Sequence, residues 1–222
     1  MKKKFLALAL SLTMVLGLAA CGGGSDNASS DGSSAAAGDS GSSTVVVAMG
    51  SGFSTLDPGY VYEKYPPMIV NACYETLFKF YSNDGAPEPC LADTYEFSED
   101  GLTLTVTLKD GITFASGNPM TSADVAFSIN RCKNLQGNPA FIADTIDSIE
   151  TPDEKTIVFH LNQQDSAILS KLTYSSLAVL DSAVVKENGG TDAEDAATTD
   201  TAQSYLDTAS AGSGMYVMTS YT

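Results

Sequence analysis

Apolar residues in the chain follow two patterns that are typical of β-strands. Residues 45–49 form a continuous apolar run closed by Gly50, as in a strand buried on both faces. Residues 102–108 alternate strictly between Leu or Val and Thr, so this strand has one buried and one solvated face. Glycine-containing turns bound this second strand, and residues 96–97 are expected in its hairpin partner.

Three helices are expected from capping signals and apolar spacing. A Pro-Pro pair at residues 66–67 opens the first helix, because proline is tolerated in the first helical turn. Thr121 lies three residues before Asp124, which is the pattern of a capping box, and the second helix is expected to end near Asn134. The third helix is expected at residues 167–173.

The remaining segments complete a mixed order of helices and strands. Residues 146–150 and 156–161 predict a second hairpin, and residues 177–180 predict a short strand. Residues 191–201 are acidic and are expected to form a loop, and residues 215–221 are expected to form a final strand. This order indicates an α/β protein in which hairpins are inserted into a chain that starts and ends on buried strands.

The N-terminal residues have the features of a secretory signal. Three lysines at residues 2–4 precede an uncharged apolar run at residues 5–16, and small residues follow at 17–20. The apolar run is too short to span a bilayer as a mature helix. We therefore expect residues 1–20 to form a signal peptide that is cleaved before Cys21.

Residues 18–21 resemble the lipobox of bacterial lipoproteins, in which the cysteine thiol receives a diacylglycerol. The resemblance implies that Cys21 carries the lipid and that the protein is held on the outer face of the cytoplasmic membrane. The alternative is an ordinary signal followed by a chance cysteine. Residues 21–43 are almost entirely Gly, Ser, Ala, Asp and Asn after the cysteine, so they are expected to form a flexible tether.

Charge and length restrict the class of partner. The 222 residues carry 27 acidic and 11 basic side chains, and the formal net charge is −16. This balance argues against binding to nucleic acid, to anionic lipid headgroups or to a polyanionic substrate. The part of the chain after the tether is long enough for one or two domains with a hydrophobic core.

The use of cysteine and histidine argues against a metal or cofactor site. Besides Cys21, the chain has an odd number of cysteines, Cys73, Cys90 and Cys132, so either one disulfide with a free thiol or three buried thiols are expected. No C-x-x-C pair is present and there is a single histidine, so neither a metal nor a cofactor is expected. His160 lies on the side of its strand opposite to the apolar residues and is expected at the surface.

Five blocks of sequence, in a fixed order, resemble those of a known family. The blocks are residues 56–58, 74–77, 89–101, 108–128 and 212–216. In these blocks the chain resembles the extracytoplasmic solute-binding proteins of the peptide/nickel ABC-importer class, family 5, and residues 108–128 are the most specific part. That family usually has tryptophan where Cys90 and Tyr95 stand, and proline where Met215 stands. These departures affect packing and leave the expected fold unchanged.

The resemblance implies the type II periplasmic-binding-protein-like fold of the peptide-binding class, in which two lobes close over a solute. Residues 44–76 and 191–222 would then form parts of lobe I, and residues 77–190 would form an inserted small α/β domain. Relatives continue beyond the block at residues 212–216 into a second lobe. The resemblance therefore implies that this chain is an N-terminal portion with an incomplete first lobe and without the second lobe.

The same resemblance implies a function in import and not in catalysis. The protein would capture peptides or other small solutes outside the cytoplasm and deliver them to an ABC permease and its ATPase, while the lipid on Cys21 attaches it to the membrane. By resemblance, the loop of Ser51, Gly52, Phe53 and Ser54 faces the ligand cleft. Gly52 allows a close approach of the backbone, and Phe53 offers an apolar contact. The alternative is a plain loop between a strand and a helix.

Other roles stand beside this interpretation. Tyr60, Tyr62 and Tyr65 lie near the loop in sequence, and packing is favoured over ligand binding for them. A signalling receptor or adhesin on the same fold is one alternative function, because a fold does not determine its function. A hydrolase is less favoured, because the chain has no G-x-S-x-G or H-E-x-x-H motif and catalysis would depend on carboxylates alone.

Overall fold

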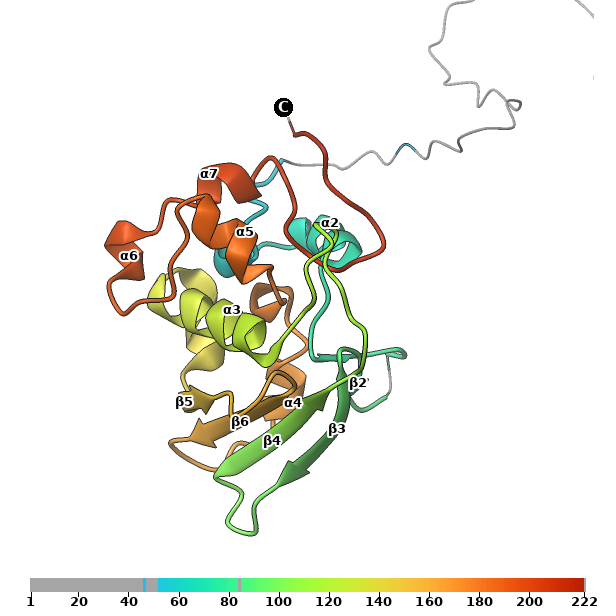
Figure 1. Cartoon of the computed structure of the whole chain (residues 1–222), viewed down its shortest axis with the longest axis vertical. Helices are drawn as coiled ribbons and strands as arrows, with labels where there is room; N and C mark the ends of the chain where they lie inside the picture. Colours follow the sequence, from blue (N-terminus) through green and yellow to red (C-terminus); the bar gives the residue numbers. More distant parts are fainter. Residues whose placement is uncertain (1–45, 47–51, 84, 222) are drawn as a thin grey trace, which may run out of the picture. The chain divides into compact units, whose positions relative to one another are not determined.

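The computed structural model describes residues 46, 52–83 and 85–221 (Figure 1). The chain divides into two units, residues 1–47 and 48–222, and the second unit contains every helix and strand described here. In chain order these elements are η1 (Pro58–Tyr60), α2 (Pro66–Cys73), β1 (Phe78–Lys79), β2 (Glu88–Pro89), β3 (Ala92–Phe97), β4 (Thr103–Leu108), α3 (Ser122–Asn134), η2 (Asn138–Ala143), β5 (Ile146–Glu150), β6 (Thr156–Leu161), α4 (Ile168–Lys171), η3 (Ser175–Leu177), α5 (Ser182–Glu187), α6 (Ala196–Thr199) and α7 (Gln203–Leu206).

Several predictions for the N-terminal part fall outside the described residues. They are the signal peptide at residues 1–20, the lipid-attachment residue Cys21 and the tether at residues 21–43. The strand at residues 45–49 is described only at Val46. All four stay predictions.

The larger β-sheet has four antiparallel strands in the order β3-β4-β6-β5. In its centre, Leu104 of β4 lies opposite Phe159 of β6, and Val106 lies opposite Ile157. The short strands β1 and β2 form a separate two-stranded sheet. Both predicted hairpins and the mixed α/β class are therefore confirmed.

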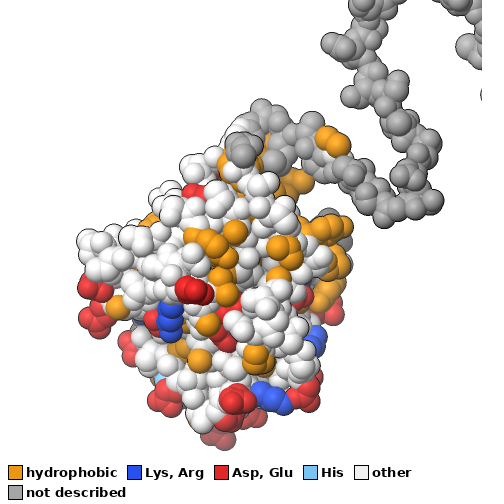
Figure 2. Space-filling view, turned by 45° about the horizontal axis from the view of Figure 1, so that its top comes forward, with side chains coloured by type: hydrophobic (Ala, Val, Ile, Leu, Met, Phe, Trp, Pro, Cys, Tyr) orange, Lys and Arg blue, Asp and Glu red, His pale blue; other side chains and the backbone are white. Residues whose placement is uncertain are grey.

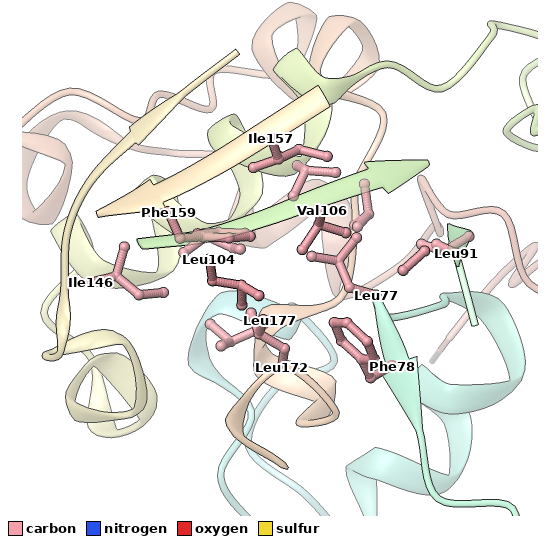
Figure 3. Packing of buried hydrophobic residues seen from close by; sticks show 14 of the residues in the cluster. Leu77, Phe78, Leu91, Leu104, Val106, Ile146, Ile157, Phe159, Leu172 and Leu177 are labelled. Carbon is pink, nitrogen blue, oxygen red and sulfur yellow. The ribbon is translucent and has the colours of Figure 1, made fainter. Parts of the chain in front are cut away.

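One face of the larger sheet carries the larger hydrophobic cluster. Alternate residues of β4 and β6 are buried, and the residues between them are only partly buried, as strict alternation predicts. Figure 3 shows Leu104 and Phe159 beside each other on this face, with Leu172 and Leu177 opposite them. Helix α3 covers the same cluster with three further residues, Val125, Ile129 and Cys132.

A second hydrophobic cluster is built without residues from the strands. Its buried members are Val61, Val70, Cys73, Tyr74, Phe127, Ala178, Leu180, Val185, Ala202, Leu206 and Ala211. Phe127 brings α3 into this cluster, whereas Val125 and Ile129 of the same helix belong to the first. In Figure 1, α3 accordingly lies between the sheet and the helices α5, α6 and α7.

Helix α3 begins at the capping box that the sequence predicts, and it ends at Asn134 as expected. The Thr121 backbone N–H donates to Asp124 Oδ2 at 2.8 Å, and the Thr121 side chain accepts from the Asp124 backbone N–H. The second carboxylate oxygen, Asp124 Oδ1, accepts from the backbone N–H and the hydroxyl of Ser182. One carboxylate therefore caps α3 and also attaches the start of α5 to it.

Two predicted strands are wrong. Residues 177–180 are buried, but Leu177 ends the 3-10 helix η3, and the Val179 N–H donates to the carbonyl of Glu75, which is in a loop and not in a strand. Residues 215–221 contain no strand, and the Tyr216 N–H donates to a carbonyl of α2. Apolar runs identify burial, but a strand also needs a partner with free hydrogen-bonding groups.

The segment after residue 181 holds more helix than the sequence analysis predicts. Residues 191–201 include the short helix α6 and are not a loop throughout. Helix α5 was also missed, although Asp181 caps it by accepting from the backbone N–H groups of Ala183 and Val184. An aspartate before a helical turn is an N-cap signal that the sequence does contain.

The cysteines in the described part of the chain, Cys73, Cys90 and Cys132, are free and buried. Of the two arrangements left open by the sequence, the structure therefore has three buried thiols. Burial, with a smaller contribution from the charge of Asp57, raises the pKa of the Cys132 thiol to about 12. The thiol of Cys132 faces the carbonyl of Gly59 at 3.9 Å.

The burial of Phe159 predicts a large loss of stability when its ring is removed. We expect Phe159→Ala to lower the free energy of unfolding by about 3–5 kcal/mol, because the cavity cannot fully collapse in the centre of a sheet. Phe97→Ala, at a 43% exposed position of the edge strand β3, should cost less than about 1 kcal/mol. Urea denaturation measures both, and equal losses would contradict the assigned burial.

The raised pKa of Cys132 predicts that its thiol does not react in the folded protein. At pH 8 almost none of it is thiolate, so iodoacetamide should leave Cys132 unmodified in buffer and modify it completely in urea. Peptide mapping by mass spectrometry measures the modification. A cysteine introduced by Ser148→Cys, on the exposed side of β5, is the positive control and should react in buffer. Equal labelling of the two cysteines in buffer would disprove the burial of Cys132.

Candidate functional site

The loop that the resemblance places at a ligand cleft is described for three of its four residues. Gly52 and Ser54 are exposed and Phe53 is half-buried, while Ser51 lies outside the described residues. The Phe53 ring stacks on Tyr221 with 5.1 Å between the ring centroids. A Cβ atom at Gly52 would meet no other atom within 4 Å, so the backbone borders open space there. A ligand-contacting role for the loop stays a prediction.

Ser54 connects this loop to the segment that follows η1. Its hydroxyl donates to Glu63 Oε1, and its backbone N–H lies 3.4 Å from Glu63 Oε2. Glu63 is next to Tyr62 in sequence, and the side chains of both are exposed. The predicted loop therefore borders a second exposed segment that carries a tyrosine and a carboxylate.

The three tyrosines near the loop have different surroundings. The Tyr62 ring meets Phe141 edge-on, with 5.4 Å between the centroids. Lys64 Nζ lies 5.7 Å from the centre of the Tyr65 ring, at the distance of a cation–π contact. Tyr60 is half-buried against Gly137, where an added Cβ would lie 2.7 Å from Tyr60 Cδ1. Tyr60 therefore packs, whereas Tyr62 is presented to solvent.

Tyr62 and Phe141 form an exposed contact that we call the aromatic pair. Their side chains are 51% and 52% exposed, although both are large and apolar. Rigid aromatic side chains that stay in solvent are typical of surfaces that bind a partner or a ligand. The exposure of Phe141 is not predictable from the sequence, because a single phenylalanine outside a periodic segment gives no signal of exposure.

The aromatic pair lies within or just after two short 3-10 helices, η2 and η1, and both of these helices pack on α3. Tyr62 follows η1 and Phe141 lies within η2. Close packing is possible because Gly59 has no side chain, since a Cβ there would lie 2.7 Å from Leu135 Cδ1 and 3.1 Å from Arg131 Nη1. The geometry of the pair therefore depends on residues near the end of α3.

Arg131 of α3 is fully buried and holds two aspartates, an arrangement that we call the Arg131 clasp. Its Nη1 and Nη2 atoms donate to the two carboxylate oxygens of Asp57 at 2.8 and 2.7 Å. Its Nε and Nη2 atoms donate to the two oxygens of Asp200 at 2.8 and 2.9 Å. Burial alone would lower the pKa of the guanidinium, but the hydrogen bonds to Asp57 and Asp200 outweigh it and raise the pKa above its ordinary value.

Backbone donors complete the hydrogen bonding of the clasp. Asp57 Oδ1 also accepts from the Gly59 N–H at 2.9 Å, so the same carboxylate begins η1. Asp200 also accepts from the backbone N–H groups of Thr191 and Ala202, at 2.9 and 3.1 Å. Two buried carboxylates against one guanidinium are tolerated because these N–H groups share the negative charge.

A further carboxylate joins the segment before η1 to α7. Asp207 Oδ1 accepts from the hydroxyl of Thr55 at 2.6 Å and from the backbone N–H of Leu56 at 2.7 Å. Asp207 follows α7 directly, so residues 55–57 are held both by α3 and by the region after residue 190. The loop at residues 52–54 is therefore continuous with a segment, residues 55–57, that hydrogen bonds hold in position.

Several surface hollows are lined by residues other than the aromatic pair. One, of about 390 Å³, is lined by Asn71, Thr76, Lys79, Phe80 and Thr173. A second, of about 210 Å³, is lined by Phe114, Ala115, Ser116, Asp181, Val184, Tyr205, Ser210, Ala211 and Val217. A third, of about 300 Å³, is lined by Phe97, Gly101, Gln164, Asp165, Ser166 and Leu169. Figure 2 shows hydrophobic side chains reaching the surface in several patches, and acidic side chains mostly around the lower half of this face.

The described residues offer little for metal chemistry. Among residues 46, 52–83 and 85–221, no three Cys, His, Asp or Glu side chains are grouped so that they could hold a metal ion. His160 Nε2 lies 3.2 Å from Glu150 Oε1, on the face of the sheet that points away from the hydrophobic cluster, as its sequence position predicts. No helix in the described part of the chain is long and apolar enough to cross a membrane.

The sequence is similar to curated binding proteins of enteric bacteria. It is 29% identical over 182 residues to the probable D,D-dipeptide-binding periplasmic protein DdpA of Escherichia coli K12, covering 80% of this chain and 33% of that protein. It is 30% identical over 147 residues to the glutathione-binding protein GsiB of Salmonella typhi, covering 65% and 28%. The chain thus spans about a third of the length of these relatives.

The structure is similar to solved binding proteins. NikZ from Campylobacter jejuni, in complex with Ni(L-His), superposes with a TM-score of 0.59 at 20% identity, over 74% of this chain and 30% of that one. The substrate-binding domain of an oligopeptide ABC transporter from Bacillus anthracis superposes with a TM-score of 0.58 at 23% identity, over 61% and 29%. These likenesses confirm the type II peptide-binding class of the periplasmic-binding-protein fold, of which the chain holds a part.

A family model matches more than half of the chain. The model of the bacterial extracellular solute-binding proteins, family 5 Middle, matches residues 86–222. The matched region includes α3 with Arg131, the helix η2 with Phe141, and Asp200 of the clasp. The family suggested by the five sequence blocks is thereby confirmed: the chain belongs to family 5 of the bacterial extracellular solute-binding proteins.

Proposed function

We propose that the protein is the extracytoplasmic substrate-binding component of an ABC importer, which captures peptides or similar small solutes and delivers them to a permease. Membership of the solute-binding family supports this function. The relatives named for dipeptide and glutathione binding indicate the chemical class of the solute. Binding and not catalysis is accordingly the proposed activity.

The observation that carries the proposal is the aromatic pair beside the predicted ligand loop. Tyr62 lies on the segment that Ser54 connects to the loop at residues 52–54, and Phe141 of η2 meets its ring edge-on; each of the two side chains is about half exposed. The face of an aromatic ring can contact apolar side chains and planar peptide groups, whatever the sequence of the bound peptide. Glu63, next to Tyr62, offers a carboxylate that can bind an ammonium group. We therefore assign Tyr62, Phe141 and the loop to the solute-contacting surface.

We also propose the domain division expected from the family resemblance. Residues 44–76 and 191–222 would belong to lobe I, and residues 77–190 to the inserted domain. The composition of the hydrophobic clusters supports this division, because the first draws all its buried residues from positions 77–179. The second draws seven of its eleven buried residues from the two lobe I ranges and the other four, Phe127, Ala178, Leu180 and Val185, from residues 77–190.

Attachment to the membrane through Cys21 belongs to the same proposal. The basic start, the apolar run and the small residues before Cys21 support cleavage and lipidation at this position. A receptor that serves a permease benefits from an anchor, because the anchor keeps it at the membrane surface.

Solute binding can be tested on the protein released from its own membranes with detergent. Native mass spectrometry identifies the co-purifying solute, and isothermal titration with that solute, or with a panel of dipeptides, glutathione and Ni(L-His), gives the affinity. We expect Tyr62→Ala and Phe141→Ala each to weaken binding about five- to tenfold, because each removes an aromatic contact.

The matched control for these variants is Phe97→Ala, which removes an exposed aromatic ring from β3. It should change the affinity less than about twofold. Equal affinities for all variants would remove the aromatic pair from the binding surface. Absence of any bound solute, together with no response to the panel, would overturn the receptor function and favour a signalling or adhesive role.

The lipid anchor is tested separately by Cys21→Ser. We expect this variant to leave the membrane fraction, because it has no thiol to receive the diacylglycerol. Ser25→Ala, four residues further along, keeps the thiol and should stay in the membrane fraction with the mass increment of the lipid. Retention of Cys21→Ser in the membrane to the same extent as the unaltered protein would contradict the anchor.

A further inference from the structure

We propose that Arg131 is a positioning residue that sets the geometry of the aromatic pair through Asp57, and that Asp200 makes this geometry dependent on the segment at residues 191–202. The proposal rests on the proposed function in so far as the aromatic pair contacts the solute. Independently of that function, we propose that the buried Arg131 clasp is mechanically connected to the exposed aromatic pair.

The first step concerns what holds the pair in place. Tyr62 comes five residues after Asp57, and Phe141 comes ten residues after Arg131. The short 3-10 helices that carry them have few internal hydrogen bonds, so they depend on packing for their position. Helix η2 packs on α3, whereas η1 packs on both η3 and α3 and meets Arg131 at Gly59.

The second step concerns direction. The guanidinium binds Asp57 through two parallel hydrogen bonds, so it fixes both the position and the plane of the carboxylate. The same carboxylate accepts from the Gly59 N–H and thereby sets the first turn of η1. A small rotation of Asp57 is therefore passed to η1 and to the residues after it.

The third step concerns the remaining arm of the clasp. Asp200 binds the other edge of the guanidinium, and its backbone partners are Thr191 and Ala202. This segment has only two buried apolar residues of its own, Ala196 and Ala202. The clasp and one further hydrogen bond, from Asn134 Nδ2 to the carbonyl of Asp192 at 2.7 Å, connect the segment to α3. Movement of the segment therefore changes the orientation of the Arg131 guanidinium relative to Asp57.

Burial of the clasp favours a positioning role over a purely stabilising one. Burying three charged groups costs several kcal/mol of desolvation for each, and apolar side chains of similar size often stabilise a protein as well or better. What apolar side chains do not provide is a fixed, directional connection between three distant segments. Among the exposed large hydrophobic residues of the described chain, Tyr62 is the nearest in sequence to Asp57, and Phe141 is the nearest to Arg131.

The test uses the absence of tryptophan from the chain. Phe141→Trp places a single fluorophore in the aromatic pair, and Phe97→Trp places one at an exposed site of the sheet in a separate protein. Acrylamide quenching is measured for each single-tryptophan protein and again after Arg131→Lys, Asp57→Asn or Asp200→Asn is introduced into it. The lysine keeps the charge and loses the planar fork. Asp165→Asn, in the partly buried pair with Lys171, is the matched control substitution.

We expect Arg131→Lys and Asp57→Asn to raise the quenching constant of the tryptophan at position 141 about twofold, because the pair opens locally. Asp200→Asn should raise it less, and Asp165→Asn should leave it unchanged. The tryptophan at position 97 should respond to none of the three clasp substitutions; Asp165→Asn is compared at position 141 alone, because Asp165 and position 97 line the same surface hollow. No change at position 141 in the clasp variants would overturn the proposal.

Parallel changes at positions 141 and 97 would also overturn it, because they would indicate general loosening and a merely structural role. If Arg131→Lys fails to fold, Asp57→Asn and Asp200→Asn decide the question by the same comparison. The readout needs no solute, so its outcome is independent of the receptor function. Titration with the co-purifying solute then shows whether affinity follows the quenching constants.

Discussion

The burial of one guanidinium between two carboxylates is the constraint on which the arrangement of the chain depends. Arg131 has no exposed surface, and its partners lie 74 and 69 residues away in the sequence. Removing three charged groups from water is tolerated only with nearly complete hydrogen bonding, which backbone N–H groups provide here. The segment before η1, helix α3 and the segment before α7 therefore meet in a single relative position.

The hydrophobic clusters and the clasp support each other through α3. One side of this helix packs on the sheet through Val125 and Ile129, and Phe127 packs with α2, α5 and α7. Asp124 at its first turn binds Ser182, and Arg131 near its last turn binds Asp57 and Asp200. Apolar packing thus decides which elements surround α3, and the polar contacts at its two ends decide their orientation.

Local patterns in the sequence predicted much of this fold but little of the site. Strict alternation predicted β4 and β6, and the capping box predicted the start of α3, because both signals act over a few residues. The strands predicted at residues 177–180 and 215–221 were wrong, because the hydrogen-bond partners of these residues lie far away in the sequence. Arg131 reads as an ordinary polar residue of a helix, and neither its burial nor the exposure of Phe141 has a periodic signature.

The order of the three clasp residues in the sequence has a consequence for folding. As the chain emerges N-terminus first, Asp57 appears early, Arg131 follows, and Asp200 comes last. Helix α3 and the hairpins can form from nearby residues, whereas the clasp must wait until the loop to Asp200 has closed. An arginine that enters the interior before then has only one of its two carboxylates. The clasp therefore closes only once Asp200, 69 residues after Arg131, has been synthesised, so the earlier segments that it joins reach their final position late in the synthesis of this unit.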